Sequence, residues 1–189
     1  GLSSPNDPSW SISGAVTFYE SPVSFYNCSF EKNNSEDGLN LVRSFFEIQN
    51  STFIDSYSDA LDIDFSDGSI KNLSIINSGN DALDVSGANI DLNQLYIELA
   101  EDKGISLGES SILNGKNIFI SGAEIGIASK DLSSLKAENV EIQSSKVAYV
   151  AFQKKPEFGP GKIIIDKAKT KNIKTNYLLE KDSSIKING

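Results

Sequence analysis

The chain has 189 residues, of which 39% are apolar and 23% charged, a composition ordinary for one soluble globular domain with a sizeable core. It contains no histidine and a single cysteine, Cys28, which excludes an internal disulfide and any zinc site or nucleophilic triad that depends on histidine. No apolar run approaches the roughly 20 residues needed to cross a bilayer, so we expect no direct membrane insertion.

Charge is distributed unevenly along the chain. Residues 1–152 carry 8 basic and 22 acidic side chains, a net charge of −14, whereas residues 153–189 carry 9 basic and 4 acidic ones, a net charge of +5. An acidic body of this size repels nucleic acid and anionic membranes, and it suits cations or neutral ligands better. We therefore expect no nucleic-acid partner.

In chain order, the sequence predicts a single domain in three parts. Residues 1–9 are rich in Pro and Ser and predict an N-terminal arm, after which Trp10 is expected to cover the first coil. Residues 10–152 hold a regular repeat, and residues 153–189 predict a Lys-rich last coil and cap. Because the chain starts at Gly1 instead of Met, we expect a processed product or a piece of a longer chain.

The central part repeats with a period of about 22 residues, a length typical of solenoids. Leucine, isoleucine or tyrosine recurs in one column, and a second apolar residue follows two positions later, which is the alternation of a strand with one buried face. A small residue precedes each member of this column. The apolar column is Leu39, Leu61, Leu83, Ile105, Ile127 and Tyr149, and the small residues are Gly38, Ala60, Ala82, Gly104, Gly126 and Ala148.

A second strand follows in each unit, and its apolar positions predict another column, formed by Ile48, Ile70, Leu92, Leu113 and Leu135. One unit slips by a residue in its first half and recovers before Gly126, as a turn insertion or deletion would cause. The units are rich in Ile, Val, Ser, Asn, Asp and Gly, which favours strands and turns over a helical repeat. We predict an all-β chain forming a right-handed parallel β-helix of about seven coils.

Two further columns have two interpretations each. The small residues either leave a shallow strip on the outer surface or lie at a tight corner, and the corner is favoured. Asn27, Asn50 and Asn72 each begin an Asn-x-Ser/Thr triplet. Since they recur at one position of the coil, a stacked ladder of side-chain amides is favoured over glycosylation.

A short acidic motif occurs twice, as Asp59-Ala60-Leu61-Asp62 and as Asp81-Ala82-Leu83-Asp84. If Leu61 and Ile63 point inward, then Asp62 and Asp64 point outward, with Asp84 beside Asp62 on the next coil. Asp37, Asp59 and Asp81 predict a second acidic ladder at the turn, and Lys103 takes the next position. Like charges so close are unfavourable unless a cation or a shared proton relieves them.

Three hypotheses account for these carboxylates. They hydrogen-bond turn amides and keep the solenoid soluble, or Asp62, Asp64 and Asp84 hold calcium, or the side chains are catalytic. The catalytic set is Asp59, Asp62, Asp81 and Asp84, with Lys103 as the cationic neighbour. No cofactor is required, although Ca²⁺ fits the second hypothesis.

Coils of this length resemble the right-handed β-helices of the pectate-lyase-like superfamily. The spacing of "SDALD" (58–62), "GNDALDV" (79–85), "DKGISLG" (102–108) and "GIASK" (126–130) is similar to that of the polygalacturonase motifs. The resemblance implies acidic roles for Asp59 and Asp81 and places Lys103 and Lys130 on the histidine and lysine of that pattern. Asn80 stands where the pattern has the first member of its Asp pair.

The segment "AFQKKPEFGPGK" (151–162) interrupts the repeat. Its Lys154, Lys155 and Phe158, together with Lys130, are candidate ligand-binding residues, with a plain turn as the favoured alternative for the segment. From these features we expect an extracellular or cell-surface module that binds or processes polysaccharide or surface glycan as a hydrolase or lyase. The alternative is a non-catalytic structural or adhesive solenoid, and further copies of the chain are a second class of partner.

Overall fold

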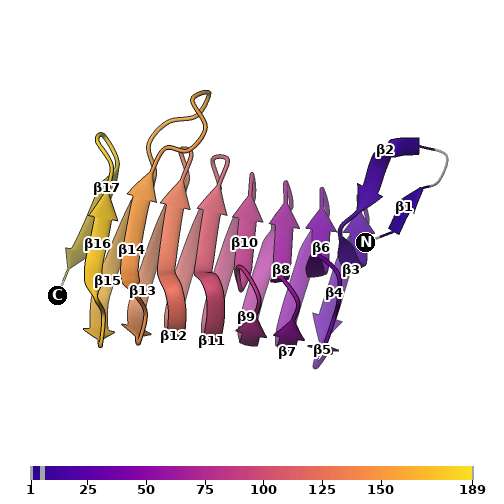
Figure 1. Cartoon of the computed structure of the whole chain (residues 1–189), viewed down its shortest axis with the longest axis horizontal. Helices are drawn as coiled ribbons and strands as arrows, with labels where there is room; N and C mark the ends of the chain where they lie inside the picture. The colour runs from indigo at the N-terminus through magenta and orange to yellow at the C-terminus, as the bar shows by residue number, and fades with distance from the viewer. Residues whose placement is uncertain (1, 5–6, 189) are drawn as a thin grey trace.

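The computed structural model describes residues 2–4 and 7–188, and their side chains from Ile12 onward. The described part of the chain is all β (Figure 1). The strands are β1 (Leu2–Ser4), β2 (Asp7–Ile12), β3 (Gly14–Tyr19), β4 (Val23–Tyr26), β5 (Ser29–Glu31), β6 (Asp37–Val42), β7 (Phe46–Ser56), β8 (Asp59–Asp64), β9 (Gly68–Ser78), β10 (Leu83–Ser86), β11 (Asn89–Gly108), β12 (Ile112–Lys130), β13 (Ser134–Gln143), β14 (Val147–Phe152), β15 (Lys162–Lys171), β16 (Thr175–Leu179) and β17 (Ser184–Asn188).

From β3 onward every pairing between strands is parallel, and the chain winds into a right-handed parallel β-solenoid of about eight turns. Figure 1 shows the coils stacked side by side along the long axis of the molecule. The predicted fold class is therefore confirmed, and the predicted number of about seven coils is close. A hydrogen-bonded strand on each of three faces explains why a coil needs about 22 residues.

The first face of the solenoid carries the acidic motif. It consists of β3, β6, β8, β10, the carboxyl ends of β11 and β12, β14 and β16. The second face begins with β4 and the first half of β7 and ends with β15 and β17, and the third face lies between them in the chain, from β5 onward. Long strands such as β11 bend around the corner between the second and third faces.

The register follows the predicted period closely. Leu83 pairs with Leu61 on one side and with Ile105 on the other. The predicted slip is confirmed: Ile90 pairs with Leu113, one position beyond the regular spacing, and the register shifts back between Ala100 and Lys103. The second apolar column was wrong beyond Leu92, because Leu92 pairs with Gly115.

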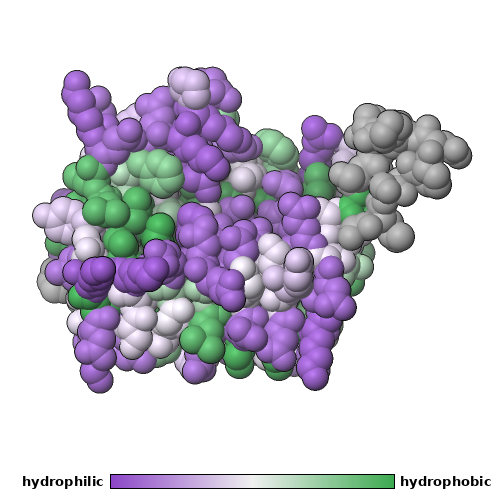
Figure 2. All heavy atoms as spheres, in the orientation of Figure 1, coloured by the Kyte–Doolittle hydropathy of each residue, from purple (hydrophilic) through white to green (hydrophobic). Residues whose placement is uncertain are grey.

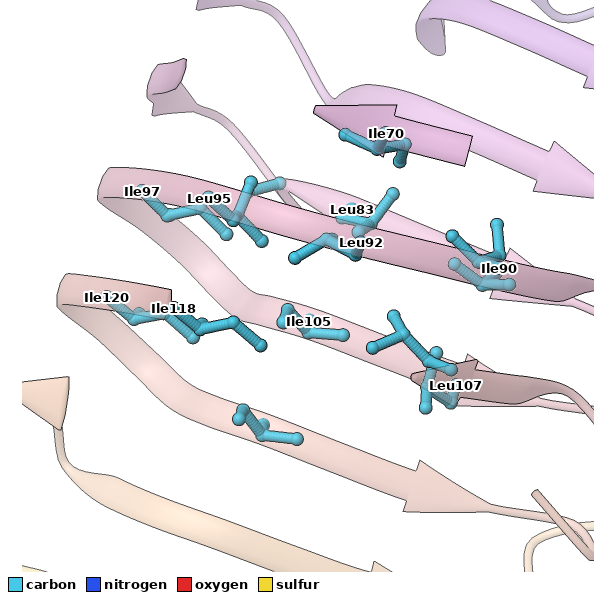
Figure 3. Packing of buried hydrophobic residues seen from close by; sticks show 14 of the residues in the cluster. Ile70, Leu83, Ile90, Leu92, Leu95, Ile97, Ile105, Leu107, Ile118 and Ile120 are labelled. Carbon is cyan, nitrogen blue, oxygen red and sulfur yellow. The ribbon is translucent and has the colours of Figure 1, made fainter. Parts of the chain in front are cut away.

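The core is one continuous set of stacked aliphatic side chains (Figure 3). Leu61, Leu83 and Ile105 are fully buried, one above the other, and each such side chain stabilises the fold by about 1.5–3 kcal/mol. Toward the N-terminus aromatic rings extend the core, and the rings of Phe30 and Phe53 stack with their centroids 4.5 Å apart. Every coil thus buries its apolar residues against the other faces of the same coil and against the neighbouring coils.

A residue with positive φ stands at each corner of the coil. The corner between the second and third faces holds asparagines, which tolerate this conformation better than other residues with a side chain. Asn72 (φ 56°) donates its amide to Oδ1 of Asn50 (φ 48°) at 2.9 Å, and Asn139 donates to Asn117 at 3.1 Å. The predicted asparagine ladder of Asn27, Asn50 and Asn72 is confirmed between Asn50 and Asn72, and the rung between Asn117 and Asn139 was not predicted.

The small-residue column is buried at a tight corner, as the favoured interpretation predicts, and the hypothesis of an outer strip is wrong. A Cβ atom on Gly104 would lie 2.7 Å from the carbonyl oxygen of Gly126 and 2.8 Å from Cγ2 of Ile120. Both contacts are closer than real Cβ atoms allow. The chain therefore turns toward the core here with room for a hydrogen atom or, at Ala60 and Ala82, a methyl group.

At the N-terminal end, β1 and β2 form an antiparallel pair that projects beyond β3 (Figure 1). The side chain of Trp10 lies outside the described residues. At the other end, residues 162–188 form a further coil whose strands β16 and β17 pair with β14 and β15. Among the described residues, no helix is long and apolar enough to span a membrane.

Candidate functional site

The acidic face is defined here as the outward side chains Asn40, Asp62, Asp64 and Asp84 on the first face. Asn40 pairs with Asp62, and Asp62 pairs with Asp84, so these three residues form one row across β6, β8 and β10. Asp64 stands two positions along β8 from Asp62. The predicted neighbours are therefore confirmed as neighbours, because the regular period places equivalent residues on adjacent strands.

Asn40 relieves part of the repulsion between Asp62 and Asp64. The Asn40 amide, which is only 4% exposed, donates to Oδ2 of Asp62 at 2.8 Å and to Oδ2 of Asp64 at 3.2 Å. Burial, followed by the charge of Asp64, raises the pKa of Asp62, and burial also raises that of Asp64. Burial and mutual repulsion therefore favour the protonated forms of these two carboxyl groups.

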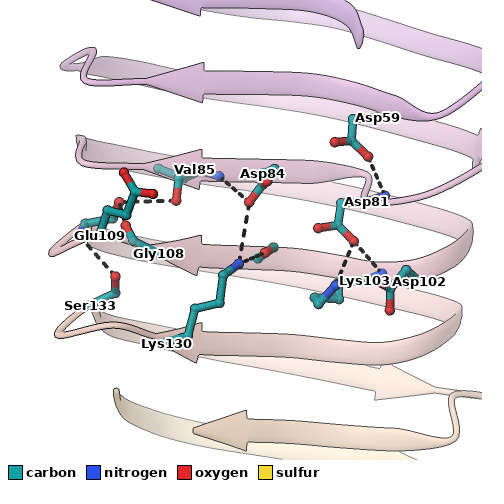
Figure 4. Close-up of polar contacts among 12 residues, drawn as sticks. Asp59, Asp81, Asp84, Val85, Asp102, Lys103, Gly108, Glu109, Lys130 and Ser133 are labelled. Atoms are coloured by element: carbon teal, nitrogen blue, oxygen red, sulfur yellow. Dashed lines mark hydrogen bonds and ion pairs between the residues drawn. The ribbon is translucent and has the colours of Figure 1, made fainter. Parts of the chain in front are cut away.

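Asp84 has a cationic neighbour that comes from two coils away. Its Oδ1 accepts the backbone N–H of Val85 at 3.0 Å and lies 3.9 Å from Nζ of Lys130 (Figure 4). The same Lys130 ammonium donates to Oγ of the buried Ser106 at 2.6 Å. The structure thus brings Lys130 to the acidic row, although the sequence placed it only through a family pattern.

Asp59, Asp81 and Lys103 are close to the acidic face, but they form a separate ladder where the chain enters the first face: Asp59 begins β8, Asp81 precedes β10, and Lys103 lies within β11. Asp59 Oδ1 accepts the backbone N–H of Asp81 at 2.8 Å, and Asp81 Oδ1 accepts that of Lys103 at 3.0 Å (Figure 4). The Lys103 ammonium lies 3.3 Å from Asp81 and also contacts Asp102. These carboxylates are turned toward backbone amides of the next coil.

Burial dominates the electrostatics of this ladder. It raises the pKa of Asp59 to about 7 and that of Asp37, which is 2% exposed, to about 6. Burial also raises the pKa of Asp81, against the opposing effect of Lys103. Desolvation therefore outweighs the hydrogen bonds that favour the charged forms.

Calcium binding at Asp62, Asp64 and Asp84 stays a prediction. Among the residues that the structure describes, no group of three or more metal-binding side chains of the Asp, Glu or Cys type is arranged to hold a metal ion. The Asn40 amide occupies the position between Asp62 and Asp64 where a cation would neutralise them. The donor set as folded suits a proton better than a divalent ion.

The loop that follows β14 is fixed by hydrogen bonds to a buried carboxylate beneath it. The carboxylate of Asp131, which is fully buried, accepts the backbone N–H groups of Lys154 at 2.6 Å and Lys155 at 2.7 Å. The Lys155 ammonium pairs with Glu109, and Gln153 donates to the carbonyl oxygen of Phe158 at 2.7 Å. Through this ion pair the loop contacts the turn after β11 rather than the acidic face.

Sequence reasoning missed Asn40, Asp131 and a groove on the second face. Asn40 carried a signal, since it stands one period before Asp62, whereas Asp131 lies at a corner whose residue type varies between coils. The groove has a volume of about 720 Å³, and its lining includes Gln49, Lys71, Asp91, Asn93, Lys116 and Glu138. The groove could not be predicted from the sequence, because its lining comes from several coils and depends on which residues share the second face.

Side chains on the first face are arranged in two zones. Figure 2 shows hydrophilic residues across the middle of the face in view and apolar residues toward its C-terminal end. The apolar zone includes Val150, which is 9% exposed, and Leu178, which is 51% exposed. No protein-family model, curated protein or solved structure matches this chain.

Proposed function

We propose that this chain is an extracellular or cell-surface solenoid module that binds polysaccharide on the acidic face. The observation that supports it best is the row of Asn40, Asp62 and Asp84 with Lys130 and Ser106, on consecutive coils. Coils about 4.8 Å apart offer hydrogen-bond groups at regular intervals along the axis, and an extended polymer of repeating hydroxylated units needs such intervals. The resemblance to pectate-lyase-like β-helices points the same way.

Cleavage is the second part of the proposal. A hydrolase needs a protonated carboxyl to protonate the leaving oxygen and a second carboxylate to act as base or nucleophile. Asp62 is the acid, because its raised pKa keeps a proton available at neutral pH, and Asp84 is the carboxylate beside it. Lys130 positions Asp84 and stabilises anionic groups of the polymer.

The test uses a panel of acidic and neutral polysaccharides, with calcium and with a chelator, and measures both binding and release of reducing or unsaturated ends. Asp62→Asn keeps a hydrogen-bond donor but has no transferable proton, so we expect binding to persist and product release to disappear. Asp84→Ala and Lys130→Ala should weaken binding at least tenfold. Asp91→Asn, on the second face, is the matched control and should change neither quantity.

A structural or adhesive solenoid is the second candidate function. The observation in its favour is that Asp59 and Asp81 engage backbone amides of neighbouring coils and leave fewer groups for a ligand. If no polymer in the panel binds, or if Asp84→Ala and Asp91→Asn behave alike, the polysaccharide proposal is wrong. The structural candidate then remains.

A further inference from the structure

The two ends of the solenoid expose strand edges. Among the described residues, β16 pairs only with β14 and β17 only with β15, while β3 pairs only with β6 and β4 only with β7. Each of these four strands therefore presents one row of backbone N–H and C=O groups without a strand partner. An open edge of this kind is a template for pairing with another strand.

Both ends also expose core side chains. The C-terminal end face is defined as Tyr177, Leu179, Ile185 and Ile187. Tyr177 is 59% exposed, Leu179 is 49% exposed and Ile187 is 44% exposed. The N-terminal end face, defined as Val16, Phe18, Val23 and Phe25, includes Val16 at 38% exposure, and its other members are only partly buried. These residues continue columns that are fully buried in the middle of the solenoid.

The two end faces match each other position by position. Following the pairings from coil to coil, Tyr177 stands in the column that begins with Val16, and Leu179 stands in the column of Phe18. On the second face, Ile185 falls in the column of Val23 and Ile187 in that of Phe25. Within each face the strands from β3 to β17 are parallel. The end strands of a second copy, shifted along the solenoid axis, would therefore pair in parallel and in register with those of the first.

The charges at the two ends are also complementary. Residues 162–188 carry seven lysines against three acidic side chains, whereas residues 12–36 carry three glutamates against one lysine. Opposite charges favour the approach of a C-terminal end to an N-terminal end, and like charges oppose the joining of two C-terminal ends.

We propose that the C-terminal end face docks on the N-terminal end face of a second copy of this chain, so that copies join head to tail into one longer solenoid. Such a contact joins two different surfaces, and because the shift along the axis does not close into a ring, it allows chains of more than two copies. The proposal is independent of polysaccharide binding. The β1–β2 pair projects at the N-terminal end, so the incoming copy must seat beside it.

The experiment measures sedimentation of the full chain as a function of protein concentration. The wild type should show a sedimentation coefficient that rises without a plateau at the dimer, and the association should weaken in high salt. The double variant Leu179→Lys/Ile187→Lys blocks one end and Val16→Lys blocks the other, and each alone should be monomeric. These positions are exposed, so circular dichroism should report an intact fold for both.

Mixing the two variants gives the decisive result. Each variant retains one functional end, so an equimolar mixture should form a dimer and nothing larger. Leu99 is exposed at a corner of a coil in the middle of the solenoid, away from both ends. Leu99→Lys is therefore the matched control and should associate like the wild type. A monomeric wild type at several concentrations, a mixture that stays monomeric, or loss of association in Leu99→Lys would each overturn the proposal.

Discussion

The carboxylate of Asp59 accepts a hydrogen bond from the backbone N–H of Asp81, one coil further along the solenoid, at 2.8 Å. Asp59→Ala would leave this buried amide without a partner, which costs about 1–3 kcal/mol. We expect the free energy of unfolding, measured by urea denaturation, to fall by that amount. Asp55→Ala removes an exposed acceptor of the Asn77 amide and should cost less than about 0.5 kcal/mol.

The raised carboxyl pKa values predict how stability changes with pH. Asp37 and Asp59 titrate near 6 and 7 in the folded chain but near 3.8 when unfolded, so the folded state binds more protons between these values. Their contribution to stability is complete below about pH 4 and is lost as the pH rises through about 7. We expect the free energy of unfolding to decrease from pH 5 to pH 7.5.

Asp59→Asn should reduce the slope of this dependence without abolishing it, because the amide has no proton to lose in the window while Asp37 still titrates there. The measurement is a set of urea unfolding curves at half-unit pH intervals. Asp55→Asn, at an exposed carboxylate, serves as the control and should keep the wild-type slope. A wild-type stability that rises steadily from pH 5 to pH 7.5 would contradict the burial of protonated carboxyls.

Two buried glycines differ in whether a methyl group would meet rigid backbone or the end of a flexible side chain. In Gly104→Ala, the new methyl group would lie 2.7 Å from the carbonyl oxygen of Gly126, so we expect a loss of about 2–3 kcal/mol in the free energy of unfolding. In Gly108→Ala, the nearest atom is Cε of Lys130 at 3.2 Å, at the end of a flexible side chain. This control should cost less than about 1 kcal/mol, and equal losses in both variants would argue against the tight corner.

The carboxylate of Asp131 fixes the loop after β14 through two backbone amides. Asp131→Ala should release the loop, and trypsin cleavage after Lys154 under native conditions should accelerate at least tenfold, which corresponds to about 1.4 kcal/mol in the opening equilibrium. Glu109→Gln weakens only the ion pair with Lys155 and should change the rate by less than threefold. Similar rates for the two variants would show that the ion pair holds the loop.

Much of the fold could be predicted from the 22-residue period and from the alternation of apolar and polar residues in each strand. Leu61 and Leu83 stand one period apart, and this spacing alone predicted their pairing and the outward position of Asp62 beside Asp84. The register beyond Leu92 failed, because the extra residue near Glu109 and Ser110 lies in a turn, where no apolar side chain marks it. Apolar periodicity predicts which strand residues point into the core, but it does not locate an extra residue in a turn, because its effect is visible only in the next strand.

The candidate site was less predictable for a physical reason. The sequence shows that Asp59 and Asp62 lie close together in the chain, but whether a carboxylate faces solvent or a backbone amide depends on side-chain torsions at the corner. Asp59 turned toward the amide of Asp81, and Asp62 remained on the outer face beside Asn40. The approach of Lys130 to Asp84 likewise spans two coils and depends on the small size of Ser106 and Gly108 between them.

The uniform parallel register bears on how a chain of this kind changes length during evolution. A duplicated segment of one full period would enter the stack as a complete new layer, with every backbone bond and every core column preserved on both sides. A duplication of another length keeps the strands on their faces only where a turn takes up the difference, as the turn after β11 and the loop after β14 do; inside a strand it would turn apolar side chains outward. The number of strand residues should therefore vary among related chains by whole coils of about 22 residues.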